Sequence, residues 1–143
     1  MKNSFIHLPQ LFLRLSISVT MLSAVADRFG LWGENSTWGN WENFEKYTQQ
    51  LTFFLPESIG CFSVYAATFL EILFSLMLIT GFKTKLAAWG TGFLFLIFAL
   101  SMSISLGIKA PLDYSVWIAS GAAFLLAVQT EFKYSIDTLI KKS

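Results

Sequence analysis

Two charged residues, Arg14 and Glu71, lie inside stretches of sequence that are otherwise apolar. Arg14 belongs to an apolar stretch over residues 5–26, and Glu71 belongs to a second one over residues 58–81. A charge at the centre of a bilayer costs about 2.5 to 3.5 kcal/mol on insertion scales. We therefore expect each of the two charges to have a partner, a route to water or a function.

The neighbours of Glu71 at helical spacing are small or weakly polar, namely Gly60, Val64, Ala67, Thr68 and Ser75. This pattern predicts that Glu71 faces protein rather than lipid, and that its charge is either paired or absent. Three interpretations stay open for Arg14. It snorkels to the cytoplasmic headgroups, it pairs with Glu71 to hold two helices together, or it lines a polar pocket that binds a ligand. Because their estimated depths nearly match, we expect Arg14 and Glu71 to be in contact.

A second group of charges lies where the apolar stretches end on the other side. Asp27 and Arg28 follow the first stretch, and Lys109 and Asp113 bracket the start of the last one. Asp113 would lie in the first turn of a helix, where the helix dipole favours an acid. These four residues are either ordinary interface charges or the rim of a pocket with Arg14 and Glu71 at its floor.

The sequence offers few groups for catalysis or for metal binding. Cys61 is the only cysteine and His7 the only histidine, so one chain can form no internal disulfide and no bis-histidine haem site. Phosphate-binding glycine loops and hydrolase motifs are absent. We expect no metal site and no cofactor held by this chain alone, and we regard catalysis by the chain alone as the weakest functional hypothesis.

The elements that must position these residues are four apolar stretches, over residues 5–26, 58–81, 86–106 and 112–128. A membrane-spanning helix needs about 20 predominantly apolar residues. The chain is 55% hydrophobic and only 13% charged, whereas soluble domains have about 25% charged residues. The sequence therefore predicts an all-α protein with one membrane domain over residues 1–143, an antiparallel bundle of four transmembrane helices.

Local signals mark the ends of these predicted helices. Pro56 and Pro111 suit the first helical positions of the second and fourth stretches. Gly81 suits the end of the second stretch, and Thr84 suits an N-cap for the third. The short link between these two residues predicts an antiparallel hairpin of the second and third helices.

The connection between the first two stretches is long and rich in tryptophan. Within it, Asn40 can cap a short helix over residues 41–51, in which Trp41, Phe44 and Tyr47 lie roughly on one side. We expect this short helix to lie in the outer membrane interface, in the first extracytoplasmic link, and a lid over an outward-facing cavity is the alternative.

The positive charges predict the orientation in the membrane. The side shared by both termini carries six cations (Lys2, Lys83, Lys85, Lys133, Lys141 and Lys142), and the other side carries three (Arg28, Lys46 and Lys109). Cytoplasmic loops are enriched in lysine and arginine, so both termini are expected in the cytoplasm. The first stretch could instead be a signal peptide cleaved after residues 24–26, although its charged N-terminal region would be unusually long and apolar.

Several segments together resemble the DoxX family of small bacterial four-helix membrane proteins. They are Leu13-Arg14-Leu15, the end of the first stretch over residues 23–30, Leu70-Glu71-Ile72 and the turn over residues 80–88. The resemblance implies a bundle in the bacterial inner membrane. It also implies that some relatives are subunits of thiosulfate- or quinol-linked oxidoreductases, and that others belong to membrane complexes of oxidative stress.

Two functional hypotheses from different classes follow. The first is an accessory or assembly subunit of a membrane complex that is linked to quinone or thiol redox chemistry. The second is a small binding or transport protein with an Arg14/Glu71 pocket for a quinone, a lipid or a small anion. The expected partners are membrane lipid and either another membrane protein or further copies of the chain. No basic patch is concentrated enough for nucleic acid.

Overall fold

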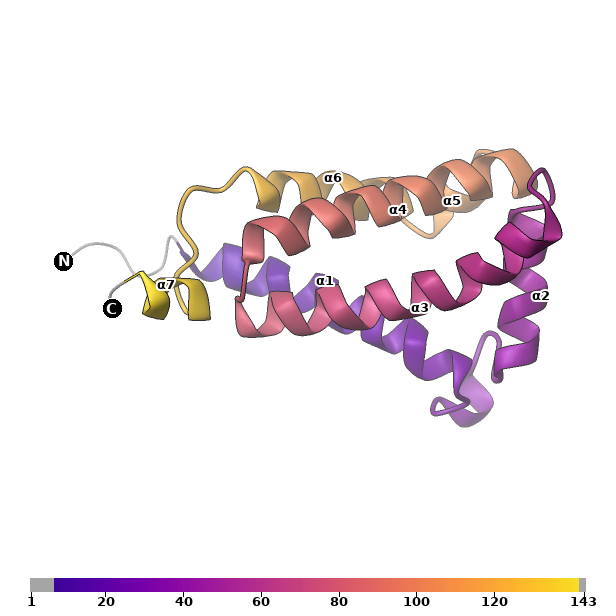
Figure 1. Ribbon diagram of the computed structural model, residues 1–143, viewed down its shortest axis with the longest axis horizontal. Coiled ribbons are helices and arrows are strands. Elements are labelled where there is room, and N and C mark those ends of the chain that lie inside the picture. The colour runs from indigo at the N-terminus through magenta and orange to yellow at the C-terminus, as the bar shows by residue number, and fades with distance from the viewer. Residues whose placement is uncertain (1–6, 142–143) are drawn as a thin grey trace.

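The computed structural model describes residues 7–141. In this range the chain forms helices and no strands, which confirms the predicted all-α class. The helices are α1 (Leu8–Arg28), η2 (Gly33–Asn35), α2 (Trp41–Leu51), α3 (Glu57–Thr80), α4 (Thr84–Leu106), α5 (Lys109–Asp113), α6 (Val116–Ala127) and α7 (Ile136–Ile140) (Figure 1). Residues 5 and 6, where the first apolar stretch was predicted to begin, lie outside the described residues.

Helices α1, α3, α4 and α6 run along the long axis of the molecule (Figure 1). Helix α3 packs against α1 and α4, and α6 packs against α4 and α1, so these four helices form what we call the helical body. Helix α2 lies across one end of the body, which we call the cap end, and α7 lies at the opposite tail end.

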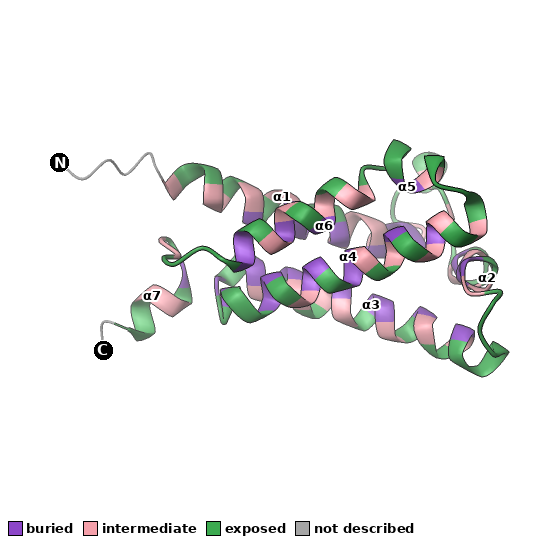
Figure 2. Ribbon diagram, turned by 90° about the horizontal axis from the view of Figure 1, so that it is seen from above, coloured by how far each residue is buried: buried purple, intermediate pink, exposed green. Residues whose placement is uncertain are grey.

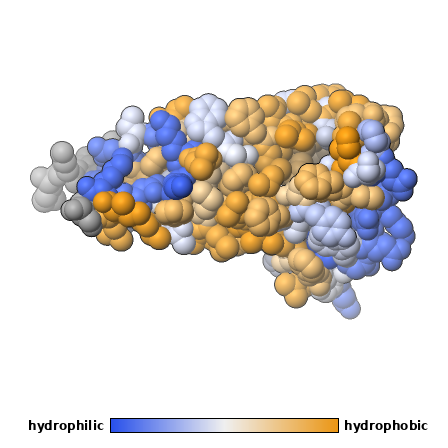
Figure 3. All heavy atoms as spheres, viewed as in Figure 1, coloured by the Kyte–Doolittle hydropathy of each residue, from blue (hydrophilic) through white to orange (hydrophobic). Residues whose placement is uncertain are grey.

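The helical body is largely apolar on its surface, and it has an apolar core. Its core contains Ile17, Met21, Leu78, Ala87, Ala88, Phe95, Ala123, Leu126 and Ala127. Large apolar side chains are also exposed around it, among them Phe12, Phe62, Phe69, Phe93, Ile104 and Ile118. Figure 2 shows exposed positions along each helix of the body. In Figure 3 the apolar surface covers the middle of the molecule, and hydrophilic residues gather towards its ends.

Within the described residues, α1, α3 and α4 are long and apolar enough to cross a membrane. An apolar surface of this kind is stable against lipid but not against water. The chain is therefore a helical membrane protein.

The ends of α3 and the start of α4 confirm one local prediction and correct two. Gly81 ends α3 with a positive φ of 69°, as expected for a helix C-terminus. Thr84 is not the N-cap of α4, since helix α4 begins at Thr84 and Lys83 takes the cap position. Pro56 likewise precedes the first residue of α3 instead of occupying it.

The fourth apolar stretch is not one continuous helix. Ser115 has a positive φ of 57°, and this residue separates α5 from α6. Helix α6 has 12 residues, which at 1.5 Å per residue is roughly 18 Å. This length is less than the hydrocarbon thickness of about 30 Å. The prediction that residues 112–128 form a single spanning helix is therefore wrong, and Pro111 lies inside α5 instead of starting that helix.

Candidate functional site

The candidate site lies where α1 reaches the cap end, and Asp27 organises its outer side. The two carboxylate oxygens of Asp27 accept hydrogen bonds from the backbone N–H groups of Thr37, Trp38 and Gly39, at 2.7, 2.8 and 3.1 Å. Three charge-assisted bonds from one turn fix that segment against the end of α1. Asp27 thereby determines where the chain enters α2.

Arg28, the next residue, points the other way, into the helical body. It is only 2% exposed, it forms an ion pair with Glu71 of α3, and it donates a hydrogen bond of 2.7 Å to the Thr68 hydroxyl. Glu71 is also only 2% exposed. An ion pair this deeply buried gains its Coulombic energy in a low dielectric and loses the hydration of both ions.

Aromatic side chains cover the guanidinium of Arg28 on its outer side. Its central carbon lies 3.8 Å from the centroid of the Phe44 ring and 5.8 Å from that of Trp38. Phe44 belongs to α2, and the Phe44 and Trp38 rings are themselves 5.0 Å apart. Cation–π contacts of this kind are worth about 2 kcal/mol when desolvated. Helix α2 is thus attached to the ion pair through Phe44.

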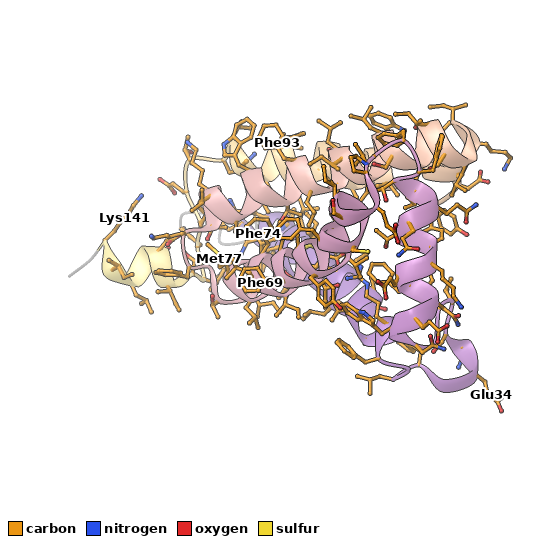
Figure 4. The ribbon with its side chains drawn as sticks, turned by 45° about the vertical axis from the view of Figure 1, so that its right-hand side comes forward. Glu34, Phe69, Phe74, Met77, Phe93 and Lys141 are labelled. Carbon is orange, nitrogen blue, oxygen red and sulfur yellow. The ribbon has the colours of Figure 1, made fainter. Side chains whose placement is uncertain are left out.

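Helix α2 has the residues and the sidedness that the sequence predicted. It spans Trp41–Leu51, and the side chain of Asn40 accepts a hydrogen bond from the N–H of Asn43 at 2.9 Å. Its buried residues Phe44, Thr48 and Leu51 face the protein, and α2 packs against α3 and α4. Helix α2 therefore packs on the helical body, and in Figure 4 it stands across the end of that body.

The predicted contact between Arg14 and Glu71 is wrong. Arg14 is fully buried, and its guanidinium donates to the carbonyl oxygens of Leu78 and Ile79 at the end of α3 and of Lys133 and Tyr134 in the tail. These four bonds have donor–acceptor distances of 2.9 to 3.4 Å. Arg14 holds the tail against the end of a helix, and it neither snorkels nor joins the ion pair.

The direction of helical side chains explains this difference. The hydroxyl of Ser75 donates to the carbonyl of Ser18, which fixes the register of α3 against α1. Glu71 then lies beside the stretch of α1 between Arg14 and Arg28. Helical side chains point towards the helix N-terminus, so Arg28 extends back to Glu71 while Arg14 extends away from it. The prediction from the sequence compared only the depths of Arg14 and Glu71 in the membrane, and it neglected the direction in which their side chains point.

The four residues predicted as a rim separate into two pairs. Asp27 and Arg28 are buried and form the centre of the site. Lys109 and Asp113 are exposed and form an ion pair with each other, one turn apart on α5. No contact joins this surface pair to Glu71 among the described residues, so it has the geometry of an ordinary interface pair.

The side of α2 that carries Tyr47 lies near Tyr114, at the break between α5 and α6. Burial raises the pKa of its phenol, and the nearby phenol of Tyr114 raises that pKa further. The indole N–H of Trp117, in the first turn of α6, is buried and has no hydrogen-bond partner among the described residues. The cap end thus brings the phenol of Tyr47 in α2 close to that of Tyr114, which lies between α5 and α6.

Within residues 7–141, no three histidine, cysteine or acidic residues are grouped closely enough to hold a metal ion. Cys61 is a half-buried free thiol whose sulfur lies 3.7 Å from the side-chain nitrogen of Gln49.

The family model described as DoxX matches residues 9–104 of the chain. This range contains Arg14, Asp27, Arg28 and Glu71, and it ends before α5, α6 and the tail. No curated protein and no solved structure matches the chain in the corresponding comparisons.

Proposed function

Because the chain belongs to the DoxX family, we propose that it is an accessory or assembly subunit of a complex in the bacterial inner membrane. In this proposal α1, α3, α4 and the α5–α6 pair form an antiparallel four-helix bundle across the membrane, with both termini in the cytoplasm. The link to quinone or thiol redox chemistry rests on the family resemblance alone, and any redox centre would belong to a partner.

The observation that carries this proposal is the ordered cap. Asp27 fixes the segment before α2, and Arg28 attaches α2 through Phe44, so both of these charged residues act to immobilise the cap end. The outward side of α2 is polar and exposed, with an ion pair of 2.7 Å between Glu42 and Lys46. A rigid polar surface loses little conformational entropy when a partner docks on it.

Affinity purification in a mild detergent, followed by mass spectrometry of proteins and small molecules, tests this proposal. We expect a membrane protein partner in stoichiometric amount. Exchanging the charges on α2, as Glu42→Lys with Lys46→Glu, keeps an i,i+4 ion pair and reverses the surface pattern. This variant should fold as before and lose the partner.

The matched control exchanges the other exposed ion pair at the same end, as Lys109→Glu with Asp113→Lys. It should retain the partner. Purification of the wild-type chain alone would refute the subunit hypothesis, and a partner that survives the exchange on α2 would refute α2 as the surface on which it docks.

The buried Arg28 favours a second candidate function, a binding or transport protein for a quinone, a lipid or a small anion. The Nε–H of Arg28 is buried, has no hydrogen-bond partner within residues 7–141, and lies beneath the aromatic residues of the cap. An unpartnered charged donor in such a place is a plausible anchor for an oxygen of a ligand. We therefore place the proposed pocket at Arg28 and Glu71 instead of at Arg14 and Glu71.

The same purification separates this candidate from the first. A small molecule that accompanies the wild-type protein, and that is lost from an Arg28→Met, Glu71→Leu double variant of unchanged stability, would support binding at this pair. A small molecule retained by that variant would refute it.

A further inference from the structure

The tail end combines exposed lysines with exposed apolar side chains. Lys83, Lys85 and Lys141 are exposed, and Lys133 is half-buried. Beside them the tail exposes Tyr134, Ile136, Leu139 and Ile140, of which Leu139 is 68% exposed. In Figure 4 Lys141 extends outwards from the end of α7, away from the helical body. Lysines next to apolar side chains are typical of elements that lie in the headgroup region of a membrane.

This tail is held in one position by polar contacts with α1 and with the α3–α4 turn. Arg14 donates to the carbonyls of Lys133 and Tyr134, and the N–H of Asp137 donates to the carbonyl of Gly81 at 3.0 Å. The Asp137 carboxylate in turn accepts the N–H groups of Lys83 and Thr84 at 2.7 and 2.8 Å, so it caps α4. The lysines and apolar residues are therefore already in place before anything binds to them, which lowers the entropy cost of binding.

The two ends of the molecule differ in the sign of their charge. At the tail end the described acids are Glu131 and Asp137, and Asp137 is engaged with the backbone of α4. The cap end exposes or half-buries the acids Glu34, Glu42, Glu45, Glu57 and Asp113, against the lysines Lys46 and Lys109. The positive charge of the molecule is thus concentrated around the tail.

We infer that the tail end binds the headgroups of acidic phospholipids. The lysines contact the lipid phosphates, while Tyr134, Leu139 and Ile140 enter the boundary between headgroups and acyl chains. Two observations select lipid as the occupant. The charge is complementary, and the tail adjoins exposed apolar side chains of the α3–α4 turn (Phe82) and of α4 (Leu86 and Trp89). This inference does not depend on the proposed subunit function.

Native mass spectrometry of the full chain in an uncharged detergent tests this inference, with added phosphatidylglycerol compared with phosphatidylcholine. We expect saturable binding of phosphatidylglycerol that weakens as salt is added. A lysine near an anionic lipid surface contributes about 1 kcal/mol, or roughly fivefold in affinity. The Lys133→Gln, Lys141→Gln variant should therefore bind phosphatidylglycerol about 25-fold more weakly.

Two further variants and a competition with inorganic phosphate make this test specific. The variant Lys83→Gln, Lys85→Gln should weaken phosphatidylglycerol binding in the same way. Its changes lie outside the tail, so a loss of binding in this variant does not result from a misfolded tail. The control Lys46→Gln, Lys109→Gln at the cap end should bind as the wild type does. Equal affinity for both lipids, equal loss in the control, or full competition by inorganic phosphate at millimolar concentration would overturn the inference.

Discussion

At the scale of single residues, three of the charges inside the helical body have distinct tasks. Arg28 neutralises Glu71. Asp27 accepts hydrogen bonds from backbone N–H groups of the cap, and Arg14 donates hydrogen bonds to carbonyl oxygens of α3 and the tail. Arginine suits the last task because its planar guanidinium donates up to five hydrogen bonds and remains charged. Each charge is compensated by a structural partner, as the cost of an unpaired charge in a membrane requires.

A double-mutant cycle tests this assignment. Arg28→Ala and Glu71→Ala should each destabilise the protein by about 3 to 5 kcal/mol, because each strands a buried charge. Combining them should cost much less than the sum, and Arg28→Met with Glu71→Leu should restore most of the stability. Thermal unfolding in detergent provides the measurement.

Arg14 supplies the control for that cycle. Arg14→Ala should also destabilise the protein, but its effect should add to that of Glu71→Ala, since the two residues share no contact. Strong coupling between Arg14 and Glu71, with none between Arg28 and Glu71, would contradict the structure.

At the scale of elements, the tail and the α3–α4 turn are packed so closely that a glycine is required between them. Gly81 has φ +69°, and a Cβ there would lie 2.5 Å from the Nη2 atom of Arg14 and 2.6 Å from the Cα of Ser135. The turn that reverses the chain is therefore also the surface on which the tail docks.

The variant Gly81→Ala should destabilise the protein by more than about 1 kcal/mol, because the left-handed backbone and the close contacts both oppose a side chain. Gly121→Ala is the matched control, since a Cβ at that position in α6 meets open space. It should be neutral or stabilise by up to about 1 kcal/mol. Thermal unfolding of both variants in one detergent checks this, and an equally harmless Gly81→Ala would mean that the tail does not dock there.

The sidedness of α2 can be tested by chemical labelling. In a Cys61→Ser background, cysteines replacing Glu42 and Lys46 should react with a water-soluble maleimide, because both side chains are exposed. Cysteines replacing Phe44 and Thr48 should be protected, because these side chains are buried against the helical body. Equal reaction rates at all four positions would exclude the packing of α2 on the ion pair of Arg28 and Glu71.

At the scale of the whole molecule, the two ends differ in charge, and the face drawn in Figure 3 is mostly apolar in the middle. The structure alters the charge balance behind the predicted orientation, because Arg28 is buried in an ion pair and does not flank the membrane. Among the described residues Lys83, Lys85, Lys133 and Lys141 remain at the tail end, against Lys46 and Lys109 at the cap end. Lys2 and Lys142 lie outside the described residues.

This bias predicts that the tail end lies in the cytoplasm, because lysine-rich ends are retained there during insertion. Reporters that are active on one side of the membrane only, fused at the C-terminal end and inserted beside Asn40, should give opposite signals. A C-terminal fusion that reports the periplasm would reverse the orientation. The intact mass of the purified protein shows in the same preparation whether the first stretch is cleaved.

The sequence by itself determined the helical class, the three long apolar helices, the position of α2 and the turn at Gly81. These features depend on local composition and periodicity, which the chain displays directly. It also indicated that Glu71 faces protein, which agrees with its burial, whereas for Arg14 it left snorkelling, pairing and a pocket open. Only the tertiary structure decided which charges meet. That choice depends on the register of α1 against α3, on the direction of helical side chains and on a tail more than a hundred residues away from Arg14. The break at Ser115 was likewise decided by packing, since an apolar stretch does not reveal where its backbone leaves the helix.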